Sequence, residues 1–78
     1  MSMSIASLIV RVKAGSAEQA TALIEAVDGL SVHTVTEKNE LIVLAEAPSP
    51  GDITALGHKL EALEPVSSVT LSYIGSDK

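Results

Sequence analysis

Apolar residues follow two different periods along this chain, and each period indicates a different kind of element. They alternate with polar residues over 5–12, which predicts a strand. After a polar break at Gly15 they recur at intervals of three and four, which predicts a helix that Ser16 caps and Gly29 ends. The apolar stripe of this helix consists of Ala20, Leu23, Ile24 and Val27.

The same order of positions returns 33 residues later. Leu8-Ile9-Val10 recurs as Leu41-Ile42-Val43, and Thr21-Ala22-Leu23 recurs as Thr54-Ala55-Leu56. The second copy again begins with a strand, over 41–47, and continues into a helix. The chain therefore contains two copies of one strand-helix unit.

The second helix and two further strands complete the pattern. Ser49 can cap this helix, Pro50 suits its first position, and Pro65 ends it. Its apolar stripe consists of Ile53, Leu56, Leu60 and Leu63. A more polar strand is predicted over 32–37, after the first helix, and a last strand over 66–74.

The predicted order of elements is βαββαβ. Right-handed crossovers place both helices on one side of a single antiparallel sheet. We therefore predict an α+β, ferredoxin-like fold: a four-stranded antiparallel sheet in strand order 4-1-3-2, with two helices on one face. A chain of 78 residues is too short for two domains, so residues 1–78 form one, with an ordered core at about 5–74.

One face of this sheet has no helix over it, and the two-residue period assigns side chains to each face. The residues predicted to face the helices are Leu8, Val10, Val12, Leu41, Val43 and Ala45. Those predicted on the uncovered face are Ile9, Arg11, Ile42, Leu44 and Glu46, with Ser68, Thr70 and Ser72 on one flank. On the other flank, the strand over 32–37 presents either Val32, Thr34 and Thr36 or His33, Val35 and Glu37.

Uncovered sheet faces usually carry polar side chains, whereas the centre of this one is aliphatic. One interpretation is that these are the scattered exposed aliphatic residues common on protein surfaces. The other is a docking surface for a peptide or a second subunit. Glu37, Glu40 and Glu46 cluster around the central hairpin, where they either form a solvated surface or attract Arg or Lys of a basic peptide.

Composition narrows the function classes further. The chain has no Cys, which excludes disulfides and thiolate metal sites, and a single aromatic residue, which disfavours stacking on bases. Ten acidic residues against five basic ones give a net charge of -5, which argues against nucleic acid as a partner. No stretch approaches the roughly 20 apolar residues of a membrane span, and no secretory signal is visible, so we expect a cytoplasmic protein.

No catalytic motif is recognisable in the sequence. The two histidines, His33 and His58, lack the neighbouring ligands of a metal site, and no nucleophile can be assigned beside them. The segment 49–52 lacks the glycine run and the lysine of a phosphate-binding loop. We therefore expect a binding protein with no catalytic residue, no metal site and no cofactor.

Four segments of the chain resemble one protein family. Residues 5–10 (IASLIV) resemble the first strand of NapD-type chaperones, and residues 29–33 (GLSVH) resemble their turn into the second strand. Residues 40–47 (ELIVLAEA) are similar to their central strand, and residues 66–73 (VSSVTLSY) to their closing strand. The likeness extends over about 5–74, almost the whole chain.

This resemblance implies a ferredoxin-like fold and no enzyme activity. It implies binding of the twin-arginine signal peptide of the periplasmic nitrate reductase catalytic subunit, which would hold back export until the molybdenum cofactor and iron–sulfur cluster of that client are inserted. The alternative is an ACT-like small-molecule-binding regulatory domain, which shares the βαββαβ order and would use Gly15 after the first strand.

Overall fold

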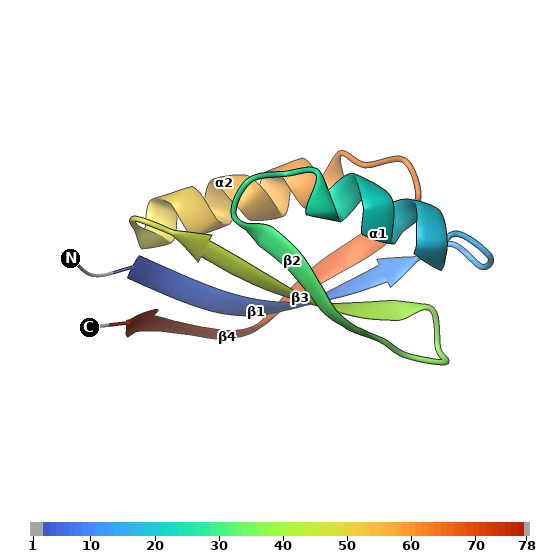
Figure 1. Cartoon of the computed structure of the whole chain (residues 1–78), viewed down its shortest axis with the longest axis horizontal. Coiled ribbons are helices and arrows are strands. Elements are labelled where there is room, and N and C mark those ends of the chain that lie inside the picture. Colours follow the sequence, from blue (N-terminus) through green and yellow to red (C-terminus); the bar gives the residue numbers. More distant parts are fainter. Residues whose placement is uncertain (1–2, 78) are drawn as a thin grey trace.

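The computed structural model describes residues 3–77 and has two layers (Figure 1). One layer is a four-stranded sheet, and the other consists of two helices that lie on the same side of it (Figure 1). In chain order the elements are β1 Met3–Val12, α1 Ala17–Glu25, β2 Leu30–Val35, β3 Glu40–Ala47, α2 Pro50–Glu61 and β4 Val66–Asp77. The predicted order βαββαβ is confirmed.

The strands lie in the order β2-β3-β1-β4, and all neighbours are antiparallel. This is the predicted order 4-1-3-2 read from the opposite edge, with β1 and β3 in the centre. β1 begins two residues earlier than the strand predicted over 5–12, and β2 lies two residues earlier than the strand predicted over 32–37. The ferredoxin-like fold is therefore confirmed, with small shifts of the strand ends.

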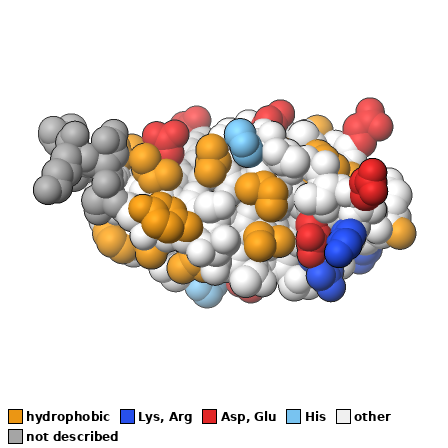
Figure 2. All heavy atoms as spheres, turned by 90° about the horizontal axis from the view of Figure 1, so that it is seen from below, with side chains coloured by type: hydrophobic (Ala, Val, Ile, Leu, Met, Phe, Trp, Pro, Cys, Tyr) orange, Lys and Arg blue, Asp and Glu red, His pale blue; other side chains and the backbone are white. Residues whose placement is uncertain are grey.

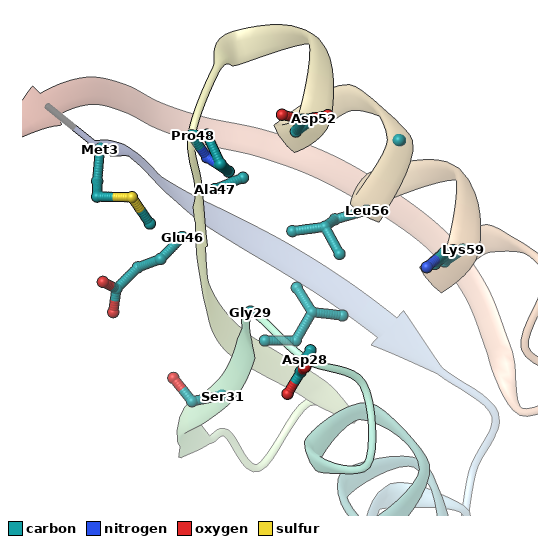
Figure 3. A pocket seen from close by; sticks show the side chains of 12 residues that line it. Met3, Asp28, Gly29, Ser31, Glu46, Ala47, Pro48, Asp52, Leu56 and Lys59 are labelled. Carbon is teal, nitrogen blue, oxygen red and sulfur yellow. The ribbon is translucent and has the colours of Figure 1, made fainter. Parts of the chain in front are cut away.

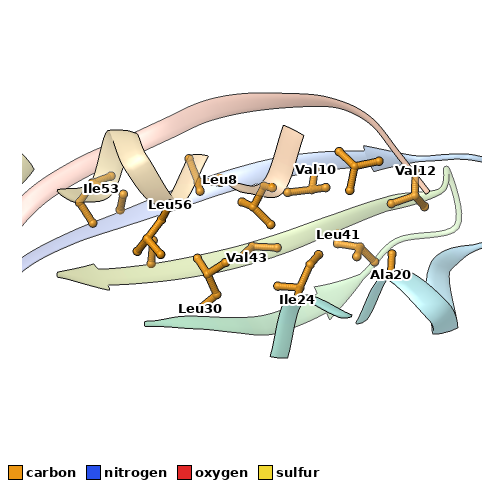
Figure 4. Close-up of a cluster of buried hydrophobic side chains, with 14 of the residues drawn as sticks. Leu8, Val10, Val12, Ala20, Ile24, Leu30, Leu41, Val43, Ile53 and Leu56 are labelled. Atoms are coloured by element: carbon orange, nitrogen blue, oxygen red, sulfur yellow. The ribbon is translucent and has the colours of Figure 1, made fainter. Parts of the chain in front are cut away.

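An aliphatic core fills the space between the sheet and the helices (Figure 4). In β1 every second residue from Ser4 to Val12 is buried, while the residues between them are at least partly exposed. The residues predicted to face the helices are all buried: Leu8, Val10, Val12, Leu41, Val43 and Ala45. A register slip of one residue would turn this whole set towards solvent, so the core also fixes which side chains occupy the other face.

The helices contribute most of their predicted stripes to this core. Ala20 and Ile24 of α1 are buried, as are three residues of α2, Ile53, Leu56 and Leu60. Leu23 was predicted in the α1 stripe but is 38% exposed. Leu23 lies about 100° around the helix axis from Ile24, and a helix of nine residues that packs through Ala20 and Ile24 leaves it at the margin.

The two helix starts differ from each other. Ser49 caps α2 as predicted: its Oγ accepts a hydrogen bond from the Asp52 backbone N–H at 3.3 Å and donates one to Asp52 Oδ2 at 3.0 Å. Ser16 stands at the N-cap of α1, but its side chain makes no capping hydrogen bond. Its ψ of 5° lies outside the extended conformation that directs a hydroxyl at the first N–H groups, so the prediction of a side-chain cap is wrong there.

Gly29 was predicted to end the first helix, and this is also wrong. The helix ends at Glu25, with Ala26 in its C-cap position. Gly29 lies in the loop that leads into β2, with a φ of +92°. A Cβ at this residue would lie 2.7 Å from the backbone oxygen of Glu46, so the glycine permits a close approach of the loop to β3.

Candidate functional site on the open sheet face

We call the helix-free side of the sheet the open face. Residues that pair across antiparallel strands carry their side chains on the same face, so the strand register defines its members. They form four rows that run from β4 across β1 to β3: Gly75–Ile5–Glu46, Tyr73–Ser7–Leu44, Thr70–Ile9–Ile42 and Ser68–Arg11–Glu40. We name these the Glu46, Leu44, Ile42 and Arg11 rows.

Most of the residues predicted on the uncovered face lie in these rows. They are Ile9, Arg11, Ile42, Leu44, Glu46, Ser68 and Thr70. Figure 2 looks onto this face: hydrophobic side chains are spread along it, and the Lys and Arg side chains in view gather at its right-hand end. The remaining predicted residue, Ser72, belongs to none of the rows.

Ser72 is missing from the rows because β4 has an irregularity at this point. Leu8 pairs with Leu71 whereas Ser7 pairs with Tyr73, so Ser72 is an extra residue without a partner on β1. An extra residue in one strand reverses the alternation of the residues that follow it. The register therefore assigns Tyr73 to the open face and leaves Ser72 outside the rows.

Tyr73 is the site residue that sequence reasoning missed. It is 63% exposed, and its ring lies over Gly75 of the same strand, where a Cβ would collide with the ring and its hydroxyl. Alternation counted from Val69 assigns Tyr73 to the helix side, and no residue in the segment marks where the extra residue falls. The only available signal was that Tyr73 is the one aromatic residue of the chain.

β2 has an irregularity of its own at His33. Ser31 and Thr34 pair with open-face residues of β3, whereas Val32 and Val35 pair with buried ones. The extra residue switches the alternation midway along the strand, so neither predicted set for this flank is right in full. The β2 flank of the open face therefore carries hydroxyl groups.

The aliphatic centre of the open face is half-buried. Ile9, Ile42 and Leu44 have neighbours on both adjoining strands, which cover part of each side chain. A partner would remove only the remaining surface from water, which contributes roughly 0.5–1 kcal/mol for each side chain, compared with about 1.5–3 kcal/mol for full burial. These residues offer a moderate apolar surface.

One end of the open face holds an ion pair. Arg11 Nη2 donates a hydrogen bond to Glu40 Oε2 at 2.8 Å, between directly paired residues of β1 and β3. The Arg11 side chain is 62% exposed and that of Glu40 is 22% exposed. Exposed pairs of this kind contribute at most about 1 kcal/mol to stability. The pair matters more for recognition. Because the Glu40 carboxylate already binds Arg11, it is less available than Glu46 to a cation of a bound partner.

The other end of the open face carries Glu46. This residue is exposed and forms no ion pair within residues 3–77. It lines a cavity of about 690 Å³ at the end of β3 (Figure 3). In Figure 3 Glu46 and Ser31 lie on one side of β3, while Asp52, Leu56 and Lys59 lie on the other. The cavity therefore runs around the edge of the sheet, from α2 to the open face.

Other candidate chemistry stays dispersed. His33 on β2 and His58 on α2 are both exposed and belong to different elements. Across residues 3–77 no three His or acidic side chains come together as metal ligands would. In the same part of the chain we find no helix with the length and hydrophobicity to traverse a bilayer. The open face, by contrast, combines apolar surface, hydroxyl groups and a carboxylate, which suits it to binding.

Comparison with known proteins gives a fold and a family. No curated protein matches the chain. The solution structure of the E. coli Tat proofreading chaperone protein NapD is similar, with a TM-score of 0.86 and 24% identity over 91% of this chain and 76% of that chain. The crystal structure of the hypothetical protein PHS023 from Pyrococcus horikoshii has a TM-score of 0.75 and 16% identity over 96% and 89% of the two chains. The family model described as NapD protein matches residues 3–78, and the chain therefore belongs to the NapD family.

Proposed function

We propose that this protein is a cytoplasmic chaperone that binds the twin-arginine signal peptide of a periplasmic nitrate reductase catalytic subunit. Binding would delay export until that client has received its molybdenum cofactor and iron–sulfur cluster. The protein would act by binding, with no enzyme activity and no cofactor of its own. Family membership supports this function and favours it over an ACT-like regulatory domain.

The observation that carries the proposal is the open face, which matches the chemistry of such a peptide. A twin-arginine signal peptide has two arginines followed by an apolar stretch. The half-buried Ile9, Ile42 and Leu44, together with Tyr73, offer apolar surface. Glu46 offers a carboxylate that a guanidinium group can pair through two hydrogen bonds. The predicted site residues Ser68 and Thr70 add hydroxyl groups on the β4 flank, which can donate to or accept from a peptide backbone.

Calorimetric titration with a twin-arginine peptide and with its twin-lysine version tests this function. We expect micromolar or tighter binding of the first peptide and weaker binding of the second, because lysine lacks the planar fork that pairs with a carboxylate. Ile42→Asp places a charge in the centre of the apolar surface and should abolish binding. Ile42→Thr keeps the β-branched shape and should weaken binding without unfolding the sheet.

Leu23→Asp is the matched control. It adds the same charge at an exposed aliphatic position of α1, on the opposite side of the sheet. This variant should bind the twin-arginine peptide as well as the unmodified chain does. No heat with either peptide, or an equal loss of affinity in Leu23→Asp and Ile42→Asp, would contradict the proposed function.

A further inference from the structure

The basic residues of the chain gather at one end of the open face. Arg11 holds the Glu40 carboxylate at 2.8 Å. Lys13 directly follows β1, and Lys38 lies in the turn between β2 and β3, so both are near the Arg11 row. Three of the five basic residues are thus at this end, with two carboxylates: Glu40, which pairs with Arg11, and Glu37 in the same turn as Lys38.

The Glu46 end has the opposite character. Glu46 stands exposed there without an ion pair within residues 3–77. Asp28 and Asp52 line the same cavity, and Lys59 is the one basic residue of 3–77 that lines it. Asp52 is partly satisfied by the Ser49 hydroxyl, at 3.0 Å. Among the described residues that line the cavity, three carboxylates stand against one ammonium, and Glu46 lies on its open-face side (Figure 3).

The apolar residues lie between these two ends. Successive rows are about 7 Å apart, so roughly 20 Å separates the Glu46 row from the Arg11 row. The Leu44 row brings Leu44 and Tyr73, and the Ile42 row brings Ile42 and Ile9. A segment that starts with cations and continues with apolar residues therefore finds matching chemistry along the face in one direction only.

We propose that the signal peptide binds the open face in a single direction, with its arginine pair at Glu46 and its apolar stretch running over the Leu44 and Ile42 rows towards Arg11. This inference rests on the proposed function and adds the orientation of the bound peptide. Glu46 is then the residue that receives an arginine, and Arg11 is the residue that rejects one.

The reverse orientation of the peptide is disfavoured at both ends of the open face. It would bring two guanidinium groups beside Arg11, Lys13 and Lys38, where the Glu40 carboxylate is already paired. It would also place the apolar end of the peptide against the Glu46 carboxylate, which has no ion-pair partner among residues 3–77 and would lose water without gaining one. Electrostatic arrangement of this kind determines the register of a bound partner more than its affinity.

Paramagnetic broadening in nuclear magnetic resonance measures this orientation directly. A nitroxide label attached before the arginine pair should broaden the amide signals of Gly29, Ser31 and Glu46 in the labelled protein and spare those of Arg11 and Ser68. A label at the far end of the apolar stretch should produce the reverse pattern. Broadening at the Arg11 end by the first label, or equal broadening at both ends, overturns the orientation while leaving the proposed function intact. A failure of the proposed function gives a different result, because neither of the two labelled peptides would then broaden or shift any amide signal.

A pair of charge variants gives a second measurement. Glu46→Gln should weaken binding of the twin-arginine peptide about fivefold, the upper range for an exposed ion pair. Glu37→Gln removes the same charge in the turn at the Arg11 end and should change the affinity less. A peptide with glutamines in place of both arginines should not distinguish the unmodified chain from Glu46→Gln. Equal losses in the two variants would overturn the assignment of Glu46 as the arginine partner.

Discussion

Gly29 determines how closely the loop before β2 approaches the Glu46 end of the open face. Its φ of +92° lies in the left-handed region, and its carbonyl oxygen accepts a hydrogen bond from the Glu46 backbone N–H at 2.8 Å. A Cβ would meet the Glu46 backbone oxygen at 2.7 Å and Leu56 Cδ1 at 3.3 Å. The first of these atoms belongs to a central strand and cannot move aside without disturbing the sheet. The residue type at this position therefore shapes one wall of the cavity.

We expect Gly29→Ala to lower the free energy of unfolding by roughly 2–4 kcal/mol, because it combines an unfavourable φ with a backbone collision. Gly15→Ala is the matched control. Gly15 also has a positive φ, of 79°, but a Cβ there would meet nothing within 4 Å. This control should cost only about 1–2 kcal/mol. Urea denaturation measures both values, and equal costs would mean that the close approach to Glu46 contributes nothing.

At the scale of elements, the two serines at the helix starts have different energetic roles. Ser49→Ala removes the 3.3 Å hydrogen bond from the Asp52 N–H and should destabilise the protein by about 1 kcal/mol. This corresponds to a fall in Tm of about 4–8 °C for a domain of this size. Ser16→Ala removes no capping bond and should leave Tm nearly unchanged. Thermal melts of the two variants compare the helices directly, and a larger loss in Ser16→Ala would contradict the assigned caps.

The central strands could be predicted from the sequence, and the edge strands only in part. β1 and β3 have partners on both sides, so any extra residue would disturb two ladders, and the alternation of Leu8, Val10, Leu41 and Val43 holds throughout. The irregularities affect the edges: β2 at His33, and β4 at Ser67 and Ser72. An edge strand is hydrogen-bonded to a neighbouring strand on one side only, so an extra residue disturbs a single ladder. Bulges are common at sheet edges for this reason. This is why the alternation places Ile9 and Ile42 on the open face but misses Tyr73.

Long-range features of the site were also beyond the sequence pattern. Arg11 and Glu40 are 29 residues apart, and they meet because the register of β1 against β3 places them opposite each other. The same register sends Glu46 to the other end of the face. Sequence reasoning grouped Glu40 and Glu46 together as acidic residues of one hairpin, whereas the strand separates them by roughly 20 Å. Only the tertiary structure distinguishes Glu40, which pairs with Arg11, from Glu46, which has no such partner within the described part of the chain.

At the scale of the whole molecule, charge is distributed along the long axis of a body that measures 39 × 20 × 17 Å. The net charge of -5 favours approach of a cationic peptide as a whole. The basic residues at the Arg11 end oppose it locally, so the field also orients the peptide before contact. The two charged ends of the sheet lie about 20 Å apart, which is more than one Debye length at physiological salt. Repulsion at the Arg11 end therefore acts on the peptide separately from attraction at the Glu46 end.

The rate of association should therefore depend on salt, while the rate of dissociation should depend on it less. For the twin-arginine peptide we expect the association rate constant to fall about tenfold between roughly 20 mM and 0.5 M salt, as stopped-flow fluorescence of a labelled peptide would measure. The peptide with glutamines in place of both arginines should associate more slowly at low salt and show little dependence on salt. Because the apolar contacts of the Leu44 and Ile42 rows are not screened, the two peptides should converge in association rate at high salt. Identical salt dependence of the two peptides would mean that the arginine pair is not what the acidic end attracts.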